Sequence, residues 1–381
     1  MEDKKLSSWE VRWRLYKKLK HDLSFTGDKI VGSMCTYPHP FAQRMYAEHL
    51  QKNVGDPGLF TGTVQIEQEA VRIMGRMLSH LHAHGAIVTG GTEANILAMW
   101  TAKEISRGKK TEIIVPEHAH FSFDKAARML GCTTIKIPCT DRFVVDVKKL
   151  RKKITGKTMA IVGVAGSTAL GTVDPIEELS DIAHEKDIYL HIDAAFGGFV
   201  LPFLSSLGRP SPSFDFSLPG VSSITIDPHK MGMSVIPAGG ILYRTKELAR
   251  TVSVPVTYLA GGETALPTIV GTRSGAAAIA CWALFHHLGL TGYQKIIRKA
   301  MDLTDWFAVE VNKLPGFTLI TPPVCNVAGI VHERLPAPDI AKKLRSQGWA
   351  VSLFNTHLRI VLMPHVKKHH LKAFLKALKN I

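Results

Sequence analysis

The sequence has few cysteines, no long apolar run and few acidic residues. Its 381 residues include five cysteines, and no two of them form a C-x-x-C pair, which is typical of a reduced, cytoplasmic protein. No run of eighteen apolar residues occurs, and the longest run, 276–285, has the length of a buried helix. The N-terminal residues lack the apolar core of a secretory signal. We therefore expect a cytoplasmic protein without a membrane partner.

Acidic residues are outnumbered by basic ones. The chain has 47 Lys and Arg against 32 Asp and Glu, which gives a formal net charge of +15. The basic runs, such as 148–153, are spread along the whole chain, whereas a nucleic-acid site concentrates basic residues on one element. We therefore expect no nucleic-acid partner. A positive field could still attract an anionic cofactor or an acidic substrate.

The distribution of apolar residues predicts an α/β fold. From about residue 72 to 244, short apolar runs alternate with amphipathic stretches, a pattern that favours a mostly parallel sheet flanked by helices. The hydrophobic share of 45% is enough for a large core. The expected strands are 86–88, 111–115, 134–137, 159–164, 189–192, 223–226 and 240–243, and the expected helices between them include 93–107 and 122–130.

The C-terminal part has a different character. Two long helices, 274–288 and 293–313, are expected first. A strand–helix–strand–strand–helix order then follows at 327–332, 339–347, 350–353, 358–363 and 366–379. The sequence thus predicts a large domain over 61–290 and a smaller C-terminal α/β domain over 291–381. Near the N-terminus, Trp9, Trp13 and Tyr16 fall at helical spacing, which predicts an amphipathic helix that docks on another surface.

Two of the expected strands end in residues of complementary chemistry. Strand 189–192 runs into Asp193, and strand 223–226 is soon followed by Lys230. Ligands of open α/β sheets bind beyond the carboxyl ends of the strands, so these two residues are expected at one site. Pyridoxal phosphate chemistry requires a lysine that forms an imine with the cofactor aldehyde and a carboxylate that keeps the pyridine nitrogen protonated.

Each of the two residues also has an ordinary structural interpretation. Asp193 could cap a following helix, but Phe196-Gly197-Gly198 is poor helix sequence. Ala195 offers a small methyl group on the same side as Asp193, suited to packing under a flat ring. Lys230 could be a surface lysine, but the apolar stretch 231–237 favours a desolvated amine whose pKa shifts toward the neutral form.

Three other strand-end turns could complete such a site. The turn Gly90–Asn95 opens a helix, and its free N–H groups and Thr92 hydroxyl could hold an anion. His120 could lie over an aromatic ring and transfer a proton, or could be an ordinary loop histidine. The small residues 166–172 could flank a ring or form a tight turn. His80, His82, His84, His118 and His120 could bind a metal, but no carboxylate or cysteine stands at ligand spacing, so no metal is expected.

Taken together, these motifs resemble a known family. His191-Ile192-Asp193-Ala194-Ala195, Asp227-Pro228-His229-Lys230 and the Gly90–Asn95 turn are similar to those of the group II pyridoxal phosphate decarboxylases. Residues 32–34, 55–58, 271–273 and 359–365 resemble the archaeal L-tyrosine/L-aspartate decarboxylase branch in particular. The resemblance covers essentially the whole chain.

The resemblance implies a fold-type I enzyme, similar to aspartate aminotransferase, that forms an obligate homodimer with its active sites at the subunit interface. The segment 1–60 would pack on this dimer. By motif match, Lys230 would hold pyridoxal 5'-phosphate, Asp193 would pair with the ring nitrogen, and His120 and Ala195 would lie on opposite ring faces. The remaining cofactor-binding residues would be Gly91, Thr92 and His229 at the phosphate, Thr272 of the partner subunit at the same phosphate, and Thr168 near the ring.

The chain departs from the family pattern at two places. Asp227 stands where many relatives have asparagine, as it does in the archaeal branch. Animal relatives carry a long mobile loop with a tyrosine thought to protonate the intermediate. The corresponding span here, 254–270, is short, and Tyr258 is its only tyrosine. His120 or Tyr258 would return the proton to the substrate.

The expected reaction is α-decarboxylation of an L-amino acid. In this branch the product would be β-alanine from L-aspartate, for coenzyme A synthesis, or tyramine from L-tyrosine, for methanofuran synthesis; we favour aspartate. Aspartate needs a cation, and Arg359 could serve a carboxylate or lie at a domain interface. A tyrosine slot could be built from Tyr37, Leu59 and Phe60. The alternatives are a carbon–carbon lyase of the sphingosine-phosphate lyase type and a non-catalytic basic binding protein.

Overall fold

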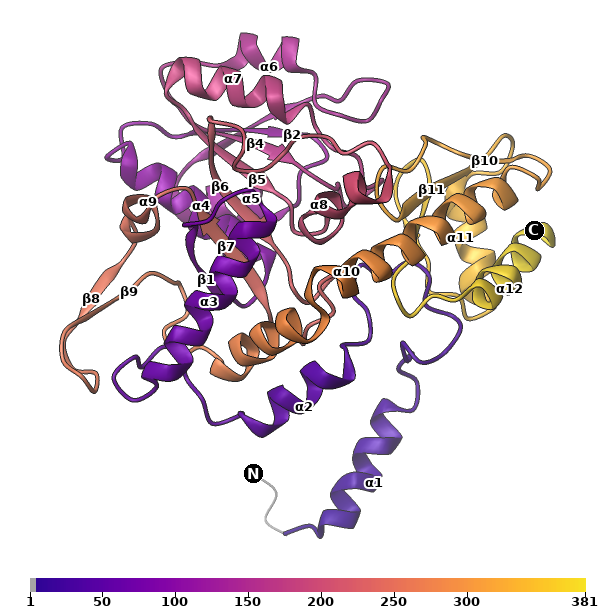
Figure 1. Ribbon diagram of the computed structural model, residues 1–381. Coiled ribbons are helices and arrows are strands. Elements are labelled where there is room, and N and C mark those ends of the chain that lie inside the picture. Colours follow the sequence, from indigo (N-terminus) through magenta and orange to yellow (C-terminus); the bar gives the residue numbers. More distant parts are fainter. Residues whose placement is uncertain (1–4) are drawn as a thin grey trace.

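A seven-stranded, mostly parallel sheet forms the centre of the molecule (Figure 1). The structure is a computed structural model that describes residues 5–381. The strand order is β1-β7-β6-β5-β4-β2-β3, and β7 alone runs antiparallel to its neighbours. All seven predicted strands are present, and the α/β fold class is confirmed. The strands are β1 His84–Val88, β2 Glu112–Pro116, β3 Thr133–Ile137, β4 Thr158–Val164, β5 Tyr189–Asp193, β6 Val221–Ile226 and β7 Gly239–Tyr243.

Helices cover both faces of this sheet because its central strands are apolar on both sides. In β4, Ala160 and Val162 join one apolar cluster with α4, while Ile161 between them joins the other with α7. This is the alternation that a strand imposes on its side chains. The helices of this part are α3 Thr61–Met77, α4 Gly91–Ile105, α5 Ser122–Leu130, α6 Val147–Lys153, α7 Ile176–Lys186, η1 Gly197–Phe199, α8 Leu201–Leu204, η2 Ser205–Leu207 and α9 Lys246–Arg250.

The C-terminal part has its own antiparallel sheet of order β10-β11-β13-β12. Its helices pack against that sheet through buried residues such as Ile340 and Phe374. The predicted order of elements is present, and the three-residue β10 is an addition that the sequence did not predict. The elements are β10 Phe317–Leu319, β11 Val327–His332, α11 Ala337–Ser346, β12 Ser352–Leu353, β13 Leu358–Val361 and α12 Lys368–Lys379.

One long helical run, α10 Gly275–Val311, connects the two parts (Figure 1). The sequence predicted two helices here. Gly289 interrupts the run, with φ 56° and ψ −174°, a backbone conformation that glycine adopts without steric cost. The break lies next to the domain boundary predicted from the sequence, and the division into 61–290 and 291–381 stays a prediction.

Two elements project from the body of the molecule (Figure 1). Helix α1 Ser8–Leu19 begins with a capping box between Ser7 and Glu10, and it buries no residue. Helix α2 Pro40–Glu48 follows it. The second projection is a hairpin of β8 Val254–Val256 and β9 Thr264–Leu266. Within residues 5–381, no helix is both long enough and apolar enough to cross a membrane.

Candidate active site

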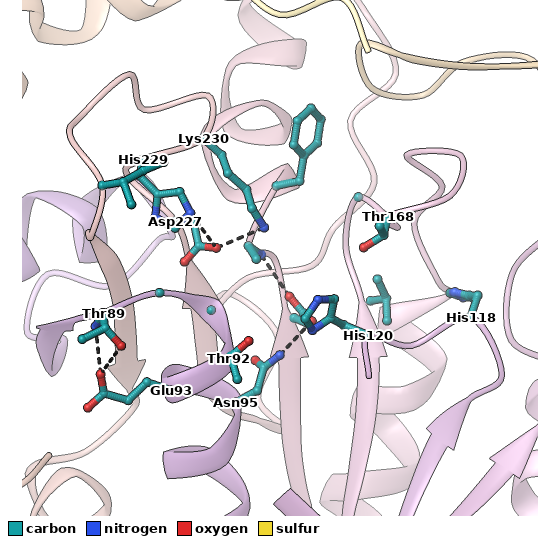
Figure 2. A pocket seen from close by; sticks show the side chains of 18 residues that line it. Thr89, Thr92, Glu93, Asn95, His118, His120, Thr168, Asp227, His229 and Lys230 are labelled. Carbon is teal, nitrogen blue, oxygen red and sulfur yellow. Dashed lines mark hydrogen bonds and ion pairs between the residues drawn. The ribbon is translucent and has the colours of Figure 1, made fainter. Parts of the chain in front are cut away.

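A cavity of about 310 Å³ opens at the carboxyl ends of β4, β5 and β6 (Figure 2). Asp193 ends β5, and the turn that follows β6 carries Lys230; both side chains line this cavity. Parallel pairing aligns the strand ends, since Val164 of β4 is paired with Asp193 and Asp193 with Thr225 of β6. The structure therefore brings together the two residues that the sequence placed at one site.

Asp193 is buried, and both of its carboxylate oxygens accept hydrogen bonds. The Ala195 N–H donates to Oδ1 at 3.2 Å, and Asn95 Nδ2 donates to Oδ2 at 3.0 Å. The carboxylate is thus held in one orientation, as a partner for a cationic ring nitrogen must be.

Asn95 is a site residue that the sequence did not single out beyond its turn. Its Oδ1 accepts from Thr225 Oγ1 at 2.7 Å and from His191 Nε2 at 3.0 Å. Burial lowers the pKa of His191 to about 4, so the ring is neutral at pH 7 and donates through Nε2. His191 lies two positions before Asp193 in β5, and residues i and i+2 of a strand share a face. This spacing is the sequence feature that places His191 on the side of the sheet that carries Asp193.

The same network fixes the state of His120. Asn95 Nδ2 also donates to Ser122 Oγ at 2.9 Å, which leaves the Ser122 hydroxyl proton for His120 Nδ1, 2.9 Å away. Burial lowers the pKa of His120, with Asp193 acting in the opposite direction and Lys230 adding to the decrease. His120 is therefore a neutral imidazole whose proton is on Nε2.

Lys230 is paired with Asp227 across one turn of chain (Figure 2). Its Nζ lies 3.0 Å from Asp227 Oδ2. Burial favours the neutral amine, but the charges of Asp227 and Asp193 outweigh it and raise the pKa of Lys230. The prediction of an amine shifted toward its neutral form was therefore wrong. The sequence shows Asp227 three residues before Lys230, but not that its carboxylate is buried against the amine.

The start of α4 forms a cradle beside this pair. Its N-cap, Gly90, provides no side-chain hydrogen bond, so the first N–H groups of α4 stay available to an anion. A Cβ atom at Gly91 would lie 2.9 Å from Asp227 Oδ2 and 3.3 Å from the Ala195 methyl group. His229 lies beside the same turn, with Cε1 3.5 Å from the Cβ position of Gly90.

These residues fit pyridoxal phosphate. The cavity offers N–H groups and a histidine for a phosphate, a lysine for the aldehyde and a fixed carboxylate for the ring nitrogen. Asp227 Oδ1 is buried and has no hydrogen-bond partner within the described part of the chain. Thr168 and Ala195 line the cavity as well.

Several predicted residues lie outside this cavity in the same chain. Tyr258 is 86% exposed near the tip of the β8–β9 hairpin, and Thr272 is exposed before α10. Leu59 and Phe60 line a separate cavity of about 480 Å³, and Tyr37 is exposed. The tyrosine-binding slot that the sequence allowed is therefore not part of the Lys230 cavity of a single chain.

Arg359 is buried and bonds to Thr168, a residue of the cavity lining, but does not line the cavity itself. Its Nη1 donates to the Thr168 carbonyl at 2.7 Å, and its Nη2 donates to the Gly32 carbonyl at 2.8 Å. Burial lowers its pKa to about 10, which still leaves it charged at pH 7. Its Nε is buried and has no partner among residues 5–381. Arg359 thus joins the large part to the N-terminal segment and keeps one donor unused.

The histidines considered for a metal do not gather at one place. His118 Nε2 lies 3.2 Å from Asp174 Oδ1 at the cavity edge, where burial lowers the pKa of His118 to about 4 and raises that of Asp174 to about 7. His80 instead donates to the Arg244 carbonyl at 2.7 Å. Among the residues that the structure describes, no three His, Cys, Asp or Glu side chains are placed to hold a metal ion.

Comparison with known proteins gives consistent results. The family profile described as "Pyridoxal-dependent decarboxylase conserved domain" matches residues 40–331. An L-aspartate decarboxylase of Thermococcus kodakarensis is 49% identical over 375 residues, which cover 98% of this chain and 97% of that protein. A probable L-tyrosine/L-aspartate decarboxylase of Methanothermobacter thermautotrophicus is 45% identical, with 94% of this chain and 99% of that protein covered.

The fold is also shared with solved structures. A sphingosine-1-phosphate lyase of Burkholderia pseudomallei superposes with a TM-score of 0.92 at 25% identity, and the match covers 100% of this chain and 91% of that one. This similarity is more distant than that of the archaeal decarboxylases, so the carbon–carbon lyase considered from the sequence is a structural neighbour only.

Proposed function

This chain belongs to the pyridoxal-dependent decarboxylase family, and from that membership we propose that it removes the α-carboxyl group of L-aspartate, leaving β-alanine. Amino-acid decarboxylation with pyridoxal phosphate is the activity of the family. The substrate is the proposed part. Its main support is the similarity to L-aspartate decarboxylases, such as that of Thermococcus kodakarensis, which is 49% identical over nearly the whole length of both chains. Arg359, which donates to the carbonyl of the cavity residue Thr168, adds a buried guanidinium with an unused Nε donor. Charge-assisted bonds to a carboxylate are the interaction that such a donor favours.

We assign the following roles in cofactor binding and decarboxylation to residues of this chain. Lys230 holds the cofactor, and Asp193, fixed by Asn95, stabilises the positive charge of the ring nitrogen. When bound, pyridoxal phosphate supplies the electron sink that accepts the electrons left by carbon dioxide. His120, Ala195 and Thr168, which line the cavity, would contact the cofactor ring.

The phosphate would be bound by Gly91, Thr92 and His229, since these lie on the side of the cavity formed by the α4 N-terminus (Figure 2). Backbone N–H groups at a helix start and a histidine are groups that favour an anion. His120 would return a proton to the substrate α-carbon from its imidazolium form, because the neutral ring is too weak an acid to release its Nε2 proton. Tyr258 is the other candidate donor.

Tyr258 and Thr272 require a second copy of the chain to act. Both are exposed and neither lines the cavity of its own chain, so we propose a homodimer in which each subunit contributes them to its partner's site. Helix α1 supports this arrangement, because none of its apolar side chains is buried against the rest of its own chain. The segment 1–60 would pack on this dimer, and we propose a cytoplasmic enzyme.

The proposal assigns the chain to β-alanine supply for coenzyme A synthesis and not to tyramine supply for methanofuran synthesis. The test is carbon dioxide release by the holoenzyme from L-aspartate, L-asparagine, L-glutamate and L-tyrosine. L-Asparagine is the matched control, because it has the shape of aspartate without the second charge. We expect kcat/KM for aspartate to exceed that for asparagine by at least about 100-fold, about 3 kcal/mol. Faster turnover of tyrosine than of aspartate would overturn the substrate assignment.

A further inference from the structure

Glu93 borders the cofactor cavity, yet its carboxylate is bonded to Thr89, as Figure 2 shows, and also to the backbone of Val270. One oxygen, Oε2, accepts from the Thr89 N–H at 2.8 Å and from the Thr89 hydroxyl at 2.7 Å. The other, Oε1, accepts from the Val270 N–H at 3.3 Å. Val270 is 177 positions away in the sequence. One buried side chain therefore connects residues 89–92, called the phosphate turn because we propose that they bind the cofactor phosphate, to the segment before α10.

A second buried carboxylate fixes the other end of that segment. Glu67 of α3 forms an ion pair with Arg273, and both are buried. Glu67 Oε1 also accepts from the Ile87 N–H at 3.0 Å, and Arg273 Nη1 donates to the Ile87 carbonyl at 2.6 Å. Ile87 belongs to β1, which leads into the phosphate turn. Segment 270–273 is thus attached to β1 at Arg273 and, through Glu93, to Thr89 at Val270.

The position of Glu93 also explains why the turn is free to bind an anion. Glu93 is the third residue of α4, where a carboxylate commonly bonds back to the N-cap in a capping box. Here it reaches past Gly90 to Thr89. The Gly90 N–H, which a capping box would occupy, therefore takes no bond from this carboxylate, and Glu93 holds the turn in place without using its N–H groups.

We propose that Glu93 is a positioning residue that couples the phosphate turn to segment 270–273, so that an anion bound at the turn also orders Thr272. Thr272 lies between the two attachment points and is exposed. This inference rests on the proposed function in one respect, that Thr272 serves the partner's site. Cofactor binding in one subunit would then prepare the site of the other, which is positive coupling in the thermodynamic sense.

The experiment measures hydrogen exchange in the apoprotein, with and without pyridoxal 5'-phosphate, in peptides covering 86–92 and 268–274. Wild type should gain protection in both regions. Glu93→Gln keeps the size of the side chain but cannot accept at both oxygens, so only 86–92 should gain protection, and the cofactor Kd should rise about tenfold. Glu104→Gln, at the exposed end of α4, is the matched control and should behave as wild type.

A second, milder variant keeps the test valid if Glu93→Gln fails to fold. Thr89→Val removes only the hydroxyl bond to Glu93 and should reduce the cofactor-linked protection of 268–274 without abolishing it. Full protection of 268–274 in Glu93→Gln would overturn the coupling while leaving the proposed function intact. If wild type shows no protection at 86–92, the cofactor site itself is wrong and both proposals fail.

Discussion

At the scale of single residues, the charge of Lys230 is decided by Asp227. The two side chains form a 3.0 Å ion pair, and Asp227 is buried. The resemblance implies a neutral asparagine at this position in many relatives and an aspartate in the archaeal branch, so the carboxylate separates this site from the former group only. Asp227 keeps the lysine protonated, and only a neutral amine can attack an aldehyde.

Asp227→Asn should therefore speed the attachment of the cofactor to the apoprotein. Asp227 raises the pKa of Lys230, so its removal lowers that pKa and increases the neutral fraction at any pH below it. We expect attachment to be about tenfold faster near pH 8, with the whole pH profile displaced to lower pH. The rate is followed by absorbance after mixing with pyridoxal phosphate.

The control for this variant is Asp302→Asn, which removes an equal charge at a distant surface site. It should leave the profile unchanged. If Asp227→Asn increased the rate equally at every pH, the effect would come from attraction of the phosphate and not from the state of Lys230, and the account of this ion pair would be wrong.

At the scale of elements, helix α1 buries none of its residues, so packing within one chain does not account for its stability. Its capping box and helical spacing define it locally, but packing normally stabilises a helix of this length. Trp9 is 70% exposed and Tyr16 is 71% exposed, and the rings of Trp9 and Trp13 stack with centroids 6.3 Å apart. The prediction of an amphipathic helix is confirmed, and its docking surface stays a prediction.

The double substitution Trp9→Ser and Trp13→Ser should weaken the proposed dimer, because it removes two large aromatic side chains from the interface. We expect the dimer dissociation constant, measured by analytical ultracentrifugation, to rise at least about 100-fold. Lys18→Ala, on the opposite face of α1, is the matched control. An unchanged dissociation constant would show that α1 does not dock on a second copy.

At the scale of the whole molecule, the sequence predicted the sheet and the position of the site because both depend on local patterns. The strands β4 and β5 are buried throughout, so they are visible as apolar runs, and Asp193 and Lys230 follow strand ends. The contact between Asn95 and Asp193 joins residues 98 positions apart, and no local pattern encodes it. The break at Gly289 and the Asp227–Lys230 ion pair also depend on packing that only the folded chain shows.

The most direct test of the whole account is to locate the cofactor chemically. The holoenzyme is reduced with borohydride, digested and analysed by mass spectrometry, with Asp193→Ala treated in parallel. We predict about one phosphopyridoxyl group per chain on the peptide that contains Lys230, and a much weaker cofactor affinity in Asp193→Ala. A label on another lysine, or no label on a protein that still decarboxylates amino acids, would contradict the claim that these two strand ends form one pyridoxal phosphate site.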